Sequence, residues 1–216
     1  MSFVLRSYWR SSCSWRVRIA LNLKGITYET IPVHLVKDGG EQHGATHQAV
    51  NPMRELPVLL VDGEPIAQSM AILEYLEETH PTPALLPKDA LSRARVRQMA
   101  ELINSGIQPI QNLRVMQRLG RDFSLEKPAQ VEWSKGWIKF GFDALHRLVD
   151  THRGQYAFGN EVSFVDLCLV PQIYNARRFN VDMAQYPHFL EIEQALAEIP
   201  AFANAHPDKQ PDAVLA

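Results

Sequence analysis

The sequence has little cysteine and no long apolar run. Cys13 and Cys168 are the only cysteines among 216 residues, and two such distant thiols argue against a disulfide framework or a cysteine-rich metal site. No window approaches the roughly 18 apolar residues of a transmembrane helix. The first residues lack the charged and apolar regions of a signal peptide. We therefore expect a soluble cytoplasmic protein with no membrane partner and no metal site.

An excess of charge of one sign is also missing. Lys and Arg number 22 against 24 Asp and Glu, which gives a formal net charge of -2. A general nucleic-acid binder normally carries a basic face, so this balance argues against one. The charge balance does not exclude a local basic pocket that binds a small anion. The length, with 46% hydrophobic residues, suits one large domain or two small ones.

The first eighty residues alternate strand and helix signals. Residues 2–9 and 28–35 are short and apolar, which predicts strands, and residues 16–25 repeat apolar side chains at helical spacing and end on Gly25. Residues 56–68 predict a hairpin turning at Asp62-Gly63. Residues 69–80 predict a helix with Ser69 as a plausible N-cap. This order predicts a mixed sheet covered by helices, the thioredoxin-like arrangement.

The second part of the chain shows only helical patterns. Three prolines in residues 80–90 interrupt both periodicities and predict a linker, set at 81–91. Helices are expected over 92–120, 128–152, 163–179 and 188–199, with a kink at Pro109 and a surface tail at 206–216. We therefore predict a thioredoxin-like domain over 1–80 and an all-helical domain over 92–216.

Two serines and a cysteine stand at the mouth of the first predicted helix. Ser11 and Ser12 could simply cap it while Cys13 packs as a small apolar residue. Alternatively, the unpaired amides and the dipole at this helix end could stabilise a thiolate. That thiolate could belong to Cys13 or to a bound thiol. Because Arg16 stands where a resolving cysteine is usual, dithiol exchange within one chain is disfavoured.

Two further stretches are compatible with binding a peptide-like ligand. Leu56-Pro57 opens a strand, and a cis bond there would leave the preceding backbone able to pair with an extended ligand. Gln68-Ser69 opens a helix, where donors could hold a carboxylate. Each stretch also has a purely structural interpretation.

Other polar pairs and the second cysteine have structural explanations. Ser163 and Asp166 form a capping-box pattern. Cys168, just inside the same predicted helix, is expected in the core.

The ordered set of these motifs resembles the zeta-class glutathione transferases, the maleylacetoacetate isomerase family. The resemblance rests on "RSSCSWRVRIALNLKG", "NPMRELPVLLVDG", "QSMAILEYLEE", "PTPALLP", "GIQPIQNLRV", "DLCLVPQ" and "HPDKQPD". It implies the glutathione transferase fold, a homodimer, glutathione as cofactor, and a small dicarboxylate substrate. The implied activity is cis–trans isomerisation of maleylacetoacetate to fumarylacetoacetate in aromatic amino acid catabolism.

The resemblance also implies roles for single residues. The catalytic set is Arg10, Ser11, Ser12 and Cys13. The residues implied to hold glutathione are Ser11, Ser12, Cys13, Gln42, Leu56, Pro57, Gln68, Ser69, Gln108 and Asn112. Arg10, Arg114 and Arg178 are the candidates for the substrate carboxylates, because guanidinium groups bind carboxylates bidentately.

One departure keeps other activities open. Maleylacetoacetate enzymes tend to have Asn-Leu-Ser where this chain has Asn112-Leu113-Arg114, and maleylpyruvate isomerases carry extra arginines nearby. The maleylpyruvate isomerases tend to replace the signature cysteine and to have a histidine at the position of Gln108. This chain keeps Cys13 and Gln108, which favours maleylacetoacetate. A conjugating transferase or dehalogenase of small halo acids is another alternative. A non-catalytic glutathione-binding protein is the non-enzyme alternative.

Overall fold

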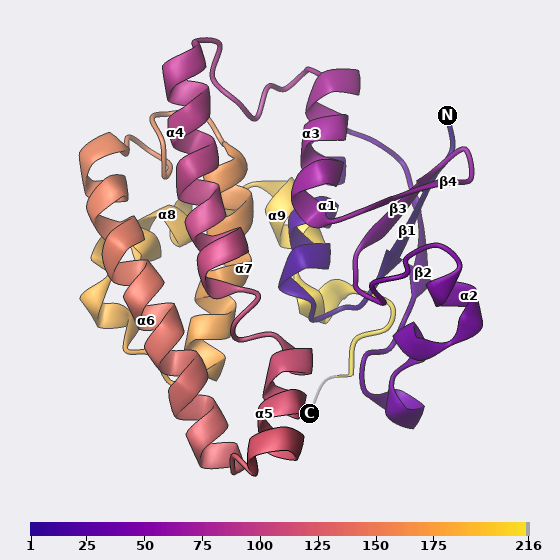
Figure 1. The fold of residues 1–216 in the computed structure, drawn as a ribbon. Coiled ribbons are helices and arrows are strands. Elements are labelled where there is room, and N and C mark those ends of the chain that lie inside the picture. Colours follow the sequence, from indigo (N-terminus) through magenta and orange to yellow (C-terminus); the bar gives the residue numbers. More distant parts are fainter. Residues whose placement is uncertain (215–216) are drawn as a thin grey trace. The chain divides into compact units, whose positions relative to one another are not determined.

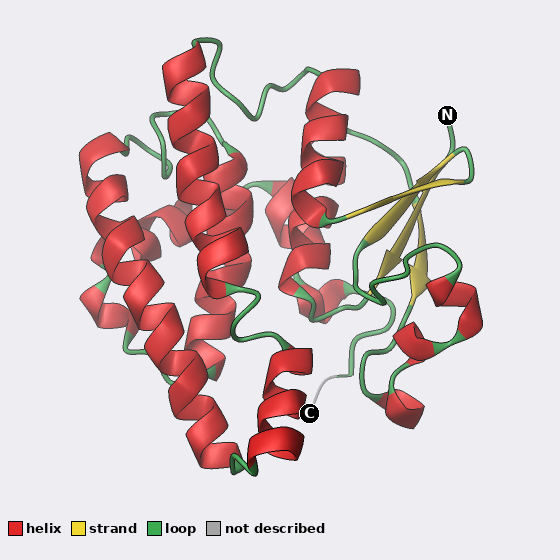
Figure 2. Cartoon of the chain, in the orientation of Figure 1, coloured by secondary structure: helices red, strands yellow, loops and turns green. Residues whose placement is uncertain are grey.

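The computed structural model describes residues 1–214, and these form two compact units. The first unit comprises Met1–Ala84 together with the segment from Ala197 onward, and the second is Leu85–Leu196. Figures 1 and 2 show strands only in the first unit and helices in both. The domain boundaries expected from the sequence stay a prediction. The segment from Ala197 onward packs with the first unit, although the sequence analysis assigned it to the second domain.

The first unit is built on a four-stranded mixed sheet in the order β2-β1-β3-β4. β1 pairs in parallel with β2, while β3 is antiparallel to both β1 and β4. The strands are β1 (Phe3–Ser7), β2 (Glu29–Pro32), β3 (Val58–Val61) and β4 (Glu64–Ala67). The two-residue turn at Asp62 and Gly63 has positive φ at both positions, 50° and 92°, as expected for this hairpin.

Helices pack on both sides of this sheet. The helices of the unit are α1 (Ser12–Leu23), α2 (Ala45–Gln48), α3 (Ser69–Thr79) and α9 (Pro200–Ala205). α1 and α3 lie on one side of the strands and α2 on the other (Figure 1). α1 also contacts α9, and that contact brings the late segment into this unit. Leu5, Val17, Leu59 and Ile72 are fully buried in the core, and Gly25 has the left-handed φ of 64° expected after α1.

The second unit is entirely helical within its described residues. Its helices are α4 (Ala90–Glu101), α5 (Leu113–Phe123), α6 (Lys127–His152), α7 (Phe164–Arg178) and α8 (Pro187–Ala197). The core includes Phe142 and Phe189, whose rings meet edge to face with centroids 5.0 Å apart. A Cβ at Gly141 would overlap the Ile107 side chain, so glycine permits close approach there.

The long helix expected over 92–120 is broken. α4 ends in a π-helical turn, Leu102–Ile107, in which the Gln108 amide donates to the Ile103 carbonyl at 2.8 Å. Pro109 has no N–H to continue the helical ladder, and the chain restarts at α5 with Asn112 as its N-cap. The break is therefore wider than the simple kink that the sequence predicts.

The capping box at the start of α7 is confirmed. The Asp166 carboxylate, fully buried, accepts hydrogen bonds from the Ser163 amide at 2.7 Å, the Ser163 hydroxyl at 2.9 Å and the Ala157 amide at 2.9 Å. Burial raises the pKa of Asp166 to about 6, although these donors oppose the rise. Cys168 is fully buried, as expected.

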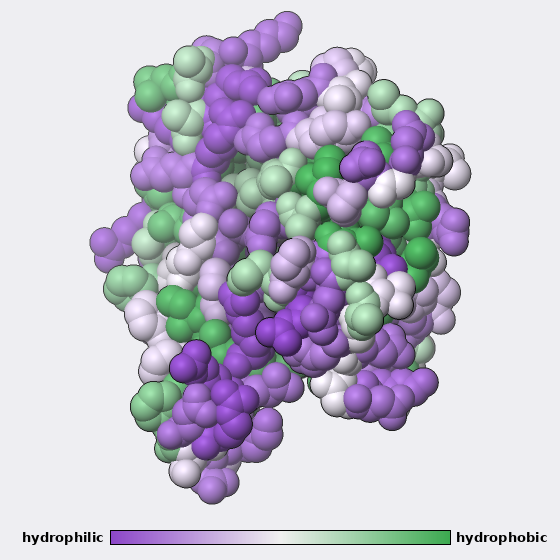
Figure 3. Space-filling model, turned by 45° about the vertical axis from the view of Figure 1, so that its right-hand side comes forward, coloured by the Kyte–Doolittle hydropathy of each residue, from purple (hydrophilic) through white to green (hydrophobic). Residues whose placement is uncertain are grey.

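The surface is mixed in character, and no helix of the described residues qualifies as a membrane span. On the face shown in Figure 3, hydrophilic residues predominate and hydrophobic residues gather in separate patches. Exposed large apolar side chains include Phe123 and Phe140, each 72% exposed.

Candidate active site

Three segments of the first unit meet at one edge of the sheet. Val58, the first residue of β3, lies opposite Arg6 of β1 and opposite Ala67 of β4. The chain that follows β1, the chain that precedes β3 and the chain that follows β4 therefore start from the same edge. These are the segments that carry Ser11–Cys13, Leu56-Pro57 and Gln68-Ser69.

At the start of α1, Ser11 is the N-cap. Its hydroxyl oxygen accepts a hydrogen bond from the Ser14 amide at 3.2 Å, while its carbonyl accepts from Trp15 at 2.9 Å. A hydroxyl carries one proton as well as two acceptor sites, so capping does not use the Ser11 proton. Ser12 is buried and Cys13 is a partly exposed free thiol. Ser11 can thus cap the helix and still donate to an anion.

The loop between β1 and α1 is fastened by a buried arginine. Arg18 donates to the Ser7 hydroxyl at 3.1 Å, the Trp9 carbonyl at 2.9 Å and the Ala205 carbonyl at 3.1 Å. Burial lowers the pKa of Arg18 to about 10, which still leaves the group charged at neutral pH. From the late segment, the Asp212 carboxylate accepts the Trp9 amide at 2.9 Å. These contacts hold the backbone just ahead of Ser11.

At the start of α3, Ser69 is buried and its hydroxyl accepts a hydrogen bond from Arg16 Nη1 at 3.3 Å. The interpretation of Ser69 as N-cap is wrong, because Gln68 occupies that position and Ser69 is the first helical residue. Its amide is therefore among the unpaired donors of a helix start. Gln68 is exposed, has a left-handed φ of 71°, and donates to the Glu55 carboxylate at 2.9 Å.

The Leu56-Pro57 bond is cis, the geometry that would leave the preceding backbone able to pair with an extended ligand. Leu56 is partly exposed and Pro57 is buried. Gln42, also buried, donates its amide N–H to the Leu35 carbonyl at 3.2 Å, which fastens the loop before α2. The roles of these three residues toward a ligand stay predictions.

Arg10, expected to meet the substrate, lies partly exposed beside the α1 helix end. Its guanidinium carbon is 5.1 Å from the centroid of the Trp9 ring, a cation–π distance that holds the group in place without using its N–H donors. Those donors can then bind a carboxylate.

The remaining candidates belong to the second unit. Gln108 follows the π-helical turn, and Asn112 caps α5 by accepting the Arg114 amide at 3.2 Å. Arg114 is exposed in the first turn of α5. Arg178 is exposed at the end of α7 and donates to Asn175 at 3.2 Å. Their roles toward glutathione or substrate stay predictions.

Several supporting residues were not foreseen from the sequence. Arg16 and Arg18 are fully buried although arginine is almost never fully buried unless it is paired, and two arginines inside an apolar helix were the available signal. The Gln111 amide donates to Gln172 at 2.8 Å in the second unit, also unforeseen. Within residues 1–214, no group of three or more His, Cys, Asp or Glu side chains is arranged to hold a metal ion.

Comparisons with known proteins agree with this geometry. Residues 10–79 match the family model of the glutathione S-transferase N-terminal domain. The maleylacetoacetate isomerase of Rattus norvegicus is 51% identical over 97% of this chain and 94% of its own length. A bacterial maleylpyruvate isomerase, described as a zeta-class glutathione S-transferase in its holo form, superposes with a TM-score of 0.94 at 43% identity, covering 98% of this chain and 100% of that one.

A third relative is the maleylacetoacetate isomerase of Anaeromyxobacter dehalogenans 2CP-1. One structure of it holds dicarboxyethyl glutathione and citrate in the active site, with a TM-score of 0.88, 45% identity, and coverage of 99% of this chain and 98% of that one. Another structure of the same protein, with a TM-score of 0.88 and 46% identity over the same shares, holds glutathione.

The mixed sheet, the helical second unit and these matches place the chain in the glutathione transferase class of proteins, which confirms the predicted fold class. Within that class, the chain belongs to the zeta-class family, that of the maleylacetoacetate isomerases.

Proposed function

We propose that this chain is a glutathione-dependent cis–trans isomerase that converts maleylacetoacetate to fumarylacetoacetate. The single observation that carries the proposal is the start of α1, where the capping Ser11 keeps a hydroxyl proton beside the helix amides. That arrangement fits a thiolate supplied by a bound ligand. The roughly 50% identity to maleylacetoacetate isomerases supports this choice of substrate.

Glutathione, when bound, would supply a thiolate whose addition makes the cis double bond a single bond, and whose elimination after rotation leaves the trans product and intact glutathione. Ser11 would donate a hydrogen bond from its hydroxyl to the thiolate sulfur, with Ser12, Cys13 and the α1 amides around it. Leu56, ahead of Pro57, would pair with the cysteinyl backbone. The hydroxyl and amide donors around the sulfur stabilise its negative charge, and because they are already in place, this lowers the barrier to thiolate addition.

Other residues would hold the two ends of the cofactor. Ser69 and Gln68, at the start of α3, would bind the glutamyl carboxylate, since helix starts favour anions. Gln42 would reach the glycine end. The family resemblance also assigns Gln108 and Asn112 to glutathione binding.

The substrate brings two carboxylates, and the arginines are the candidates to bind them. Arg10, with its guanidinium on the Trp9 ring, would take the reacting end, and Arg178 and Arg114 the far end. Orientation by such contacts contributes to rate because the reacting atoms are held in position.

The activity is tested by incubating the chain with maleylacetoacetate and glutathione and following the ultraviolet absorbance of the product. Isomerisation must require glutathione and leave its concentration unchanged. Consumption of glutathione would instead indicate a conjugating transferase or dehalogenase. Binding without turnover of any of these substrates would indicate a non-catalytic glutathione-binding protein.

Maleylpyruvate is the second candidate substrate, favoured by the likeness to a maleylpyruvate isomerase and by the arginine at position 114. The two are distinguished by kcat/KM measured on both substrates with one preparation. A higher value for maleylpyruvate would replace the primary proposal.

Arg178→Ala tests how the diacid is held. Loss of a charged contact together with misorientation should cost about 2–4 kcal/mol of transition-state binding, or roughly 30- to 1,000-fold in kcat/KM. Conjugation of a neutral electrophile, measured in parallel, should change far less. Equal losses on both substrates would assign Arg178 to the fold or the glutathione site, and Arg177→Ala, next to it on α7, is the matched control.

The cellular setting is proposed from the family alone. We infer a cytoplasmic homodimer acting in aromatic amino acid catabolism. Light scattering at micromolar concentration should then report about twice the 24.5 kDa chain mass, and a monomer throughout that range would contradict the homodimer.

A further inference from the structure

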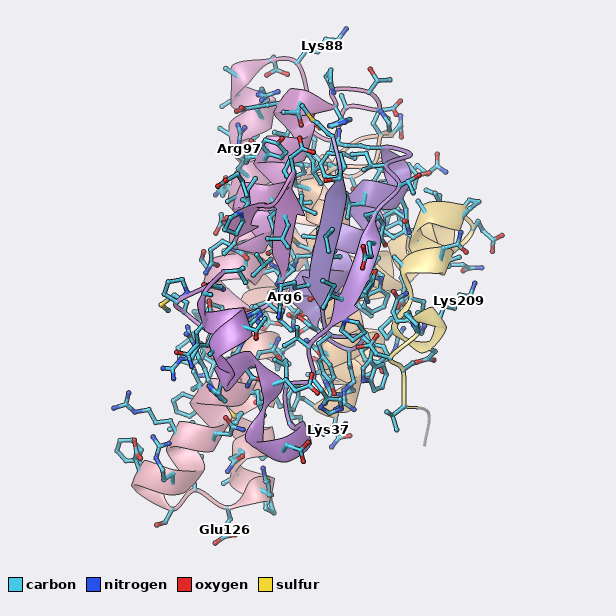
Figure 4. The ribbon with its side chains drawn as sticks, turned by 90° about the vertical axis from the view of Figure 1, so that its right-hand side faces the viewer. Arg6, Lys37, Lys88, Arg97, Glu126 and Lys209 are labelled. Atoms are coloured by element: carbon cyan, nitrogen blue, oxygen red, sulfur yellow. The ribbon has the colours of Figure 1, made fainter. Side chains whose placement is uncertain are left out.

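A buried histidine lies beneath the segment that leads into β3. His47 of α2 is 1% exposed. Its Nδ1 is 3.2 Å from Nε of Arg6, on β1, and its Nε2 is 3.0 Å from the Glu55 carbonyl oxygen. Arg6 is labelled in Figure 4, where it lies beside α2. The imidazole thus joins the sheet to the residue just before Leu56-Pro57.

The two partners determine the protonation state of this imidazole. A guanidinium N–H can only donate and a carbonyl oxygen can only accept. Nδ1 of His47 must therefore accept from Arg6, and Nε2 must donate to Glu55. Only the neutral ring with its proton on Nε2 satisfies both contacts.

Glu55 is held from two sides. Its carbonyl oxygen accepts from His47 and from Asn51 Nδ2, the latter at 2.9 Å, while its carboxylate accepts from Gln68 Nε2 at 2.9 Å. The residue therefore couples α2 to the start of α3. It immediately precedes Leu56, the residue assigned to the cysteinyl backbone of glutathione.

We propose that His47, kept as the neutral Nε2–H tautomer by Arg6, is a positioning residue that holds the Glu55–Pro57 segment in its glutathione-binding conformation. The proposal rests on the glutathione site described under the proposed function. His47 itself touches neither glutathione nor substrate in this scheme, and acts through the Glu55 carbonyl.

The arrangement makes glutathione binding sensitive to acid. Protonation would place an N–H on Nδ1 facing the Arg6 N–H, so that contact would be lost and two positive charges would meet. A turn of the ring that relieves this repulsion would remove its donor from the Glu55 carbonyl. The charged group that contacts the ring is Arg6 on β1, whereas Glu55, on the segment before β3, contacts it through the neutral backbone carbonyl.

The electrostatic surroundings favour the neutral ring near neutral pH. Burial, and to a lesser extent the positive charge of Arg6, lower the pKa of His47, while the hydrogen bond to Glu55 opposes the shift. The hold on the segment is therefore present at neutral pH and is lost as pH falls through this lowered pKa.

The experiment measures binding of S-methylglutathione to the full chain by calorimetry, from about pH 7 down to about pH 5. This thioether has no thiol to ionise, and its carboxylates and amine titrate outside that range. Wild type should bind about five- to tenfold more weakly at the acidic end, the effect of losing one hydrogen bond to a buried group.

Three variants separate positioning from bulk structure. His47→Gln keeps an amide donor for Glu55 and cannot be protonated, so affinity should stay within about twofold of wild type and become independent of pH. His47→Leu should bind about five- to tenfold more weakly at every pH. Arg6→Met removes the charge that a protonated ring would meet, so the loss of affinity in acid should become smaller than in wild type. His80→Gln, the same change elsewhere in the unit, is the control.

The outcomes are distinguishable. A wild-type affinity that does not change with pH, or a His47→Gln profile that still falls in acid, would overturn the positioning role while leaving the glutathione site intact. No binding of S-methylglutathione to wild type at about pH 7 would contradict the proposed site itself, and the positioning role with it. If His47→Leu does not fold, the wild-type and His47→Gln profiles decide the question.

Discussion

Two helices of this protein start with a serine cap, and they use it in opposite ways. At α7 the helix itself contains a carboxylate: Asp166 is fully buried and accepts hydrogen bonds from Ser163 and Ala157. At α1 the Ser11 cap satisfies one amide, and the first turn carries no acidic residue. A helix end that contains its own carboxylate is closed to other anions, whereas one without a carboxylate can bind one. The same cap thus serves folding at α7 and leaves the start of α1 open for the proposed glutathione site.

The largest expected effect is on the closed helix end. Asp166→Ala would leave the buried Ser163 and Ala157 amides without an acceptor, at about 1–3 kcal/mol each. The free energy of unfolding should therefore fall by about 2–6 kcal/mol, measured by urea denaturation. Asp89→Ala, which removes an exposed cap at α4, is the control and should cost much less. Equal losses in both would show that the burial of Asp166 is unimportant.

The open helix end is tested by Ser11→Ala. Removing the donor to the thiolate should lower kcat/KM by about 100- to 1,000-fold, as for the loss of one preorganised donor. The titration of bound glutathione, followed by thiolate absorbance, should move to higher pH. Cys13→Ala should change both quantities less. The reverse order would transfer the activating role to Cys13, and unchanged secondary structure by circular dichroism would exclude unfolding of α1 as the cause.

The pH dependence of stability sharpens the contrast. Burial raises the pKa of Asp166 from 3.8 to about 6, so between these values the folded state binds more protons than the unfolded state. Stability contributed by this group is then present in acid and is lost as pH rises through about 6, by on the order of 3 kcal/mol. The difference in unfolding free energy between wild type and Asp166→Asn should show this slope. A difference that is flat from about pH 4 to 7 would contradict it.

The smallest expected effect lies at a third helix end, the start of α3. Ser69→Ala should weaken glutathione binding by about 1.5–3 kcal/mol, the range for a charged hydrogen bond, as measured by calorimetry. Ser92→Ala, in the first turn of α4, is the control and should not change binding. An unchanged affinity in Ser69→Ala would remove this residue from the site.

Local patterns predicted much of the fold because they depend on neighbours in sequence. The four strands and the helices α1 and α3 of the first unit, the Asp62-Gly63 turn and the Ser163–Asp166 capping box are all found, whereas α2 and α9 were not predicted. The break before α5 was predicted only as a kink. A proline shows where the helical hydrogen bonds stop, but it does not show where the next helix begins. The position of Ser69 was wrong by one residue, because the left-handed Gln68 takes the cap position.

Contacts between distant residues were beyond the sequence. Periodicity marks Val17 and Leu21 as core residues, yet it cannot show that Arg18 finds acceptors at Trp9 and Ala205. The same holds for Asp212, which was expected only to lie on the surface and instead accepts the Trp9 amide. The segments of the candidate site in the first unit were predicted because two of them open helices and one opens a strand with proline. The residues that fix the position of those segments, such as Arg18 and Asp212, were not predicted.

The hydrogen bonds that Arg18 donates to Trp9 and Ala205 affect when the loop ahead of Ser11 can form during synthesis. One of its acceptors, Ala205, is translated after the whole of the second unit, although Ser11 and the strands are translated first. A nascent chain that has not yet released this late segment lacks the Ala205 acceptor for Arg18 and the Asp212 carboxylate for Trp9. The loop ahead of Ser11 can therefore be completed only after the helical unit has been translated, so that unit can form before the candidate site at Ser11 is in place.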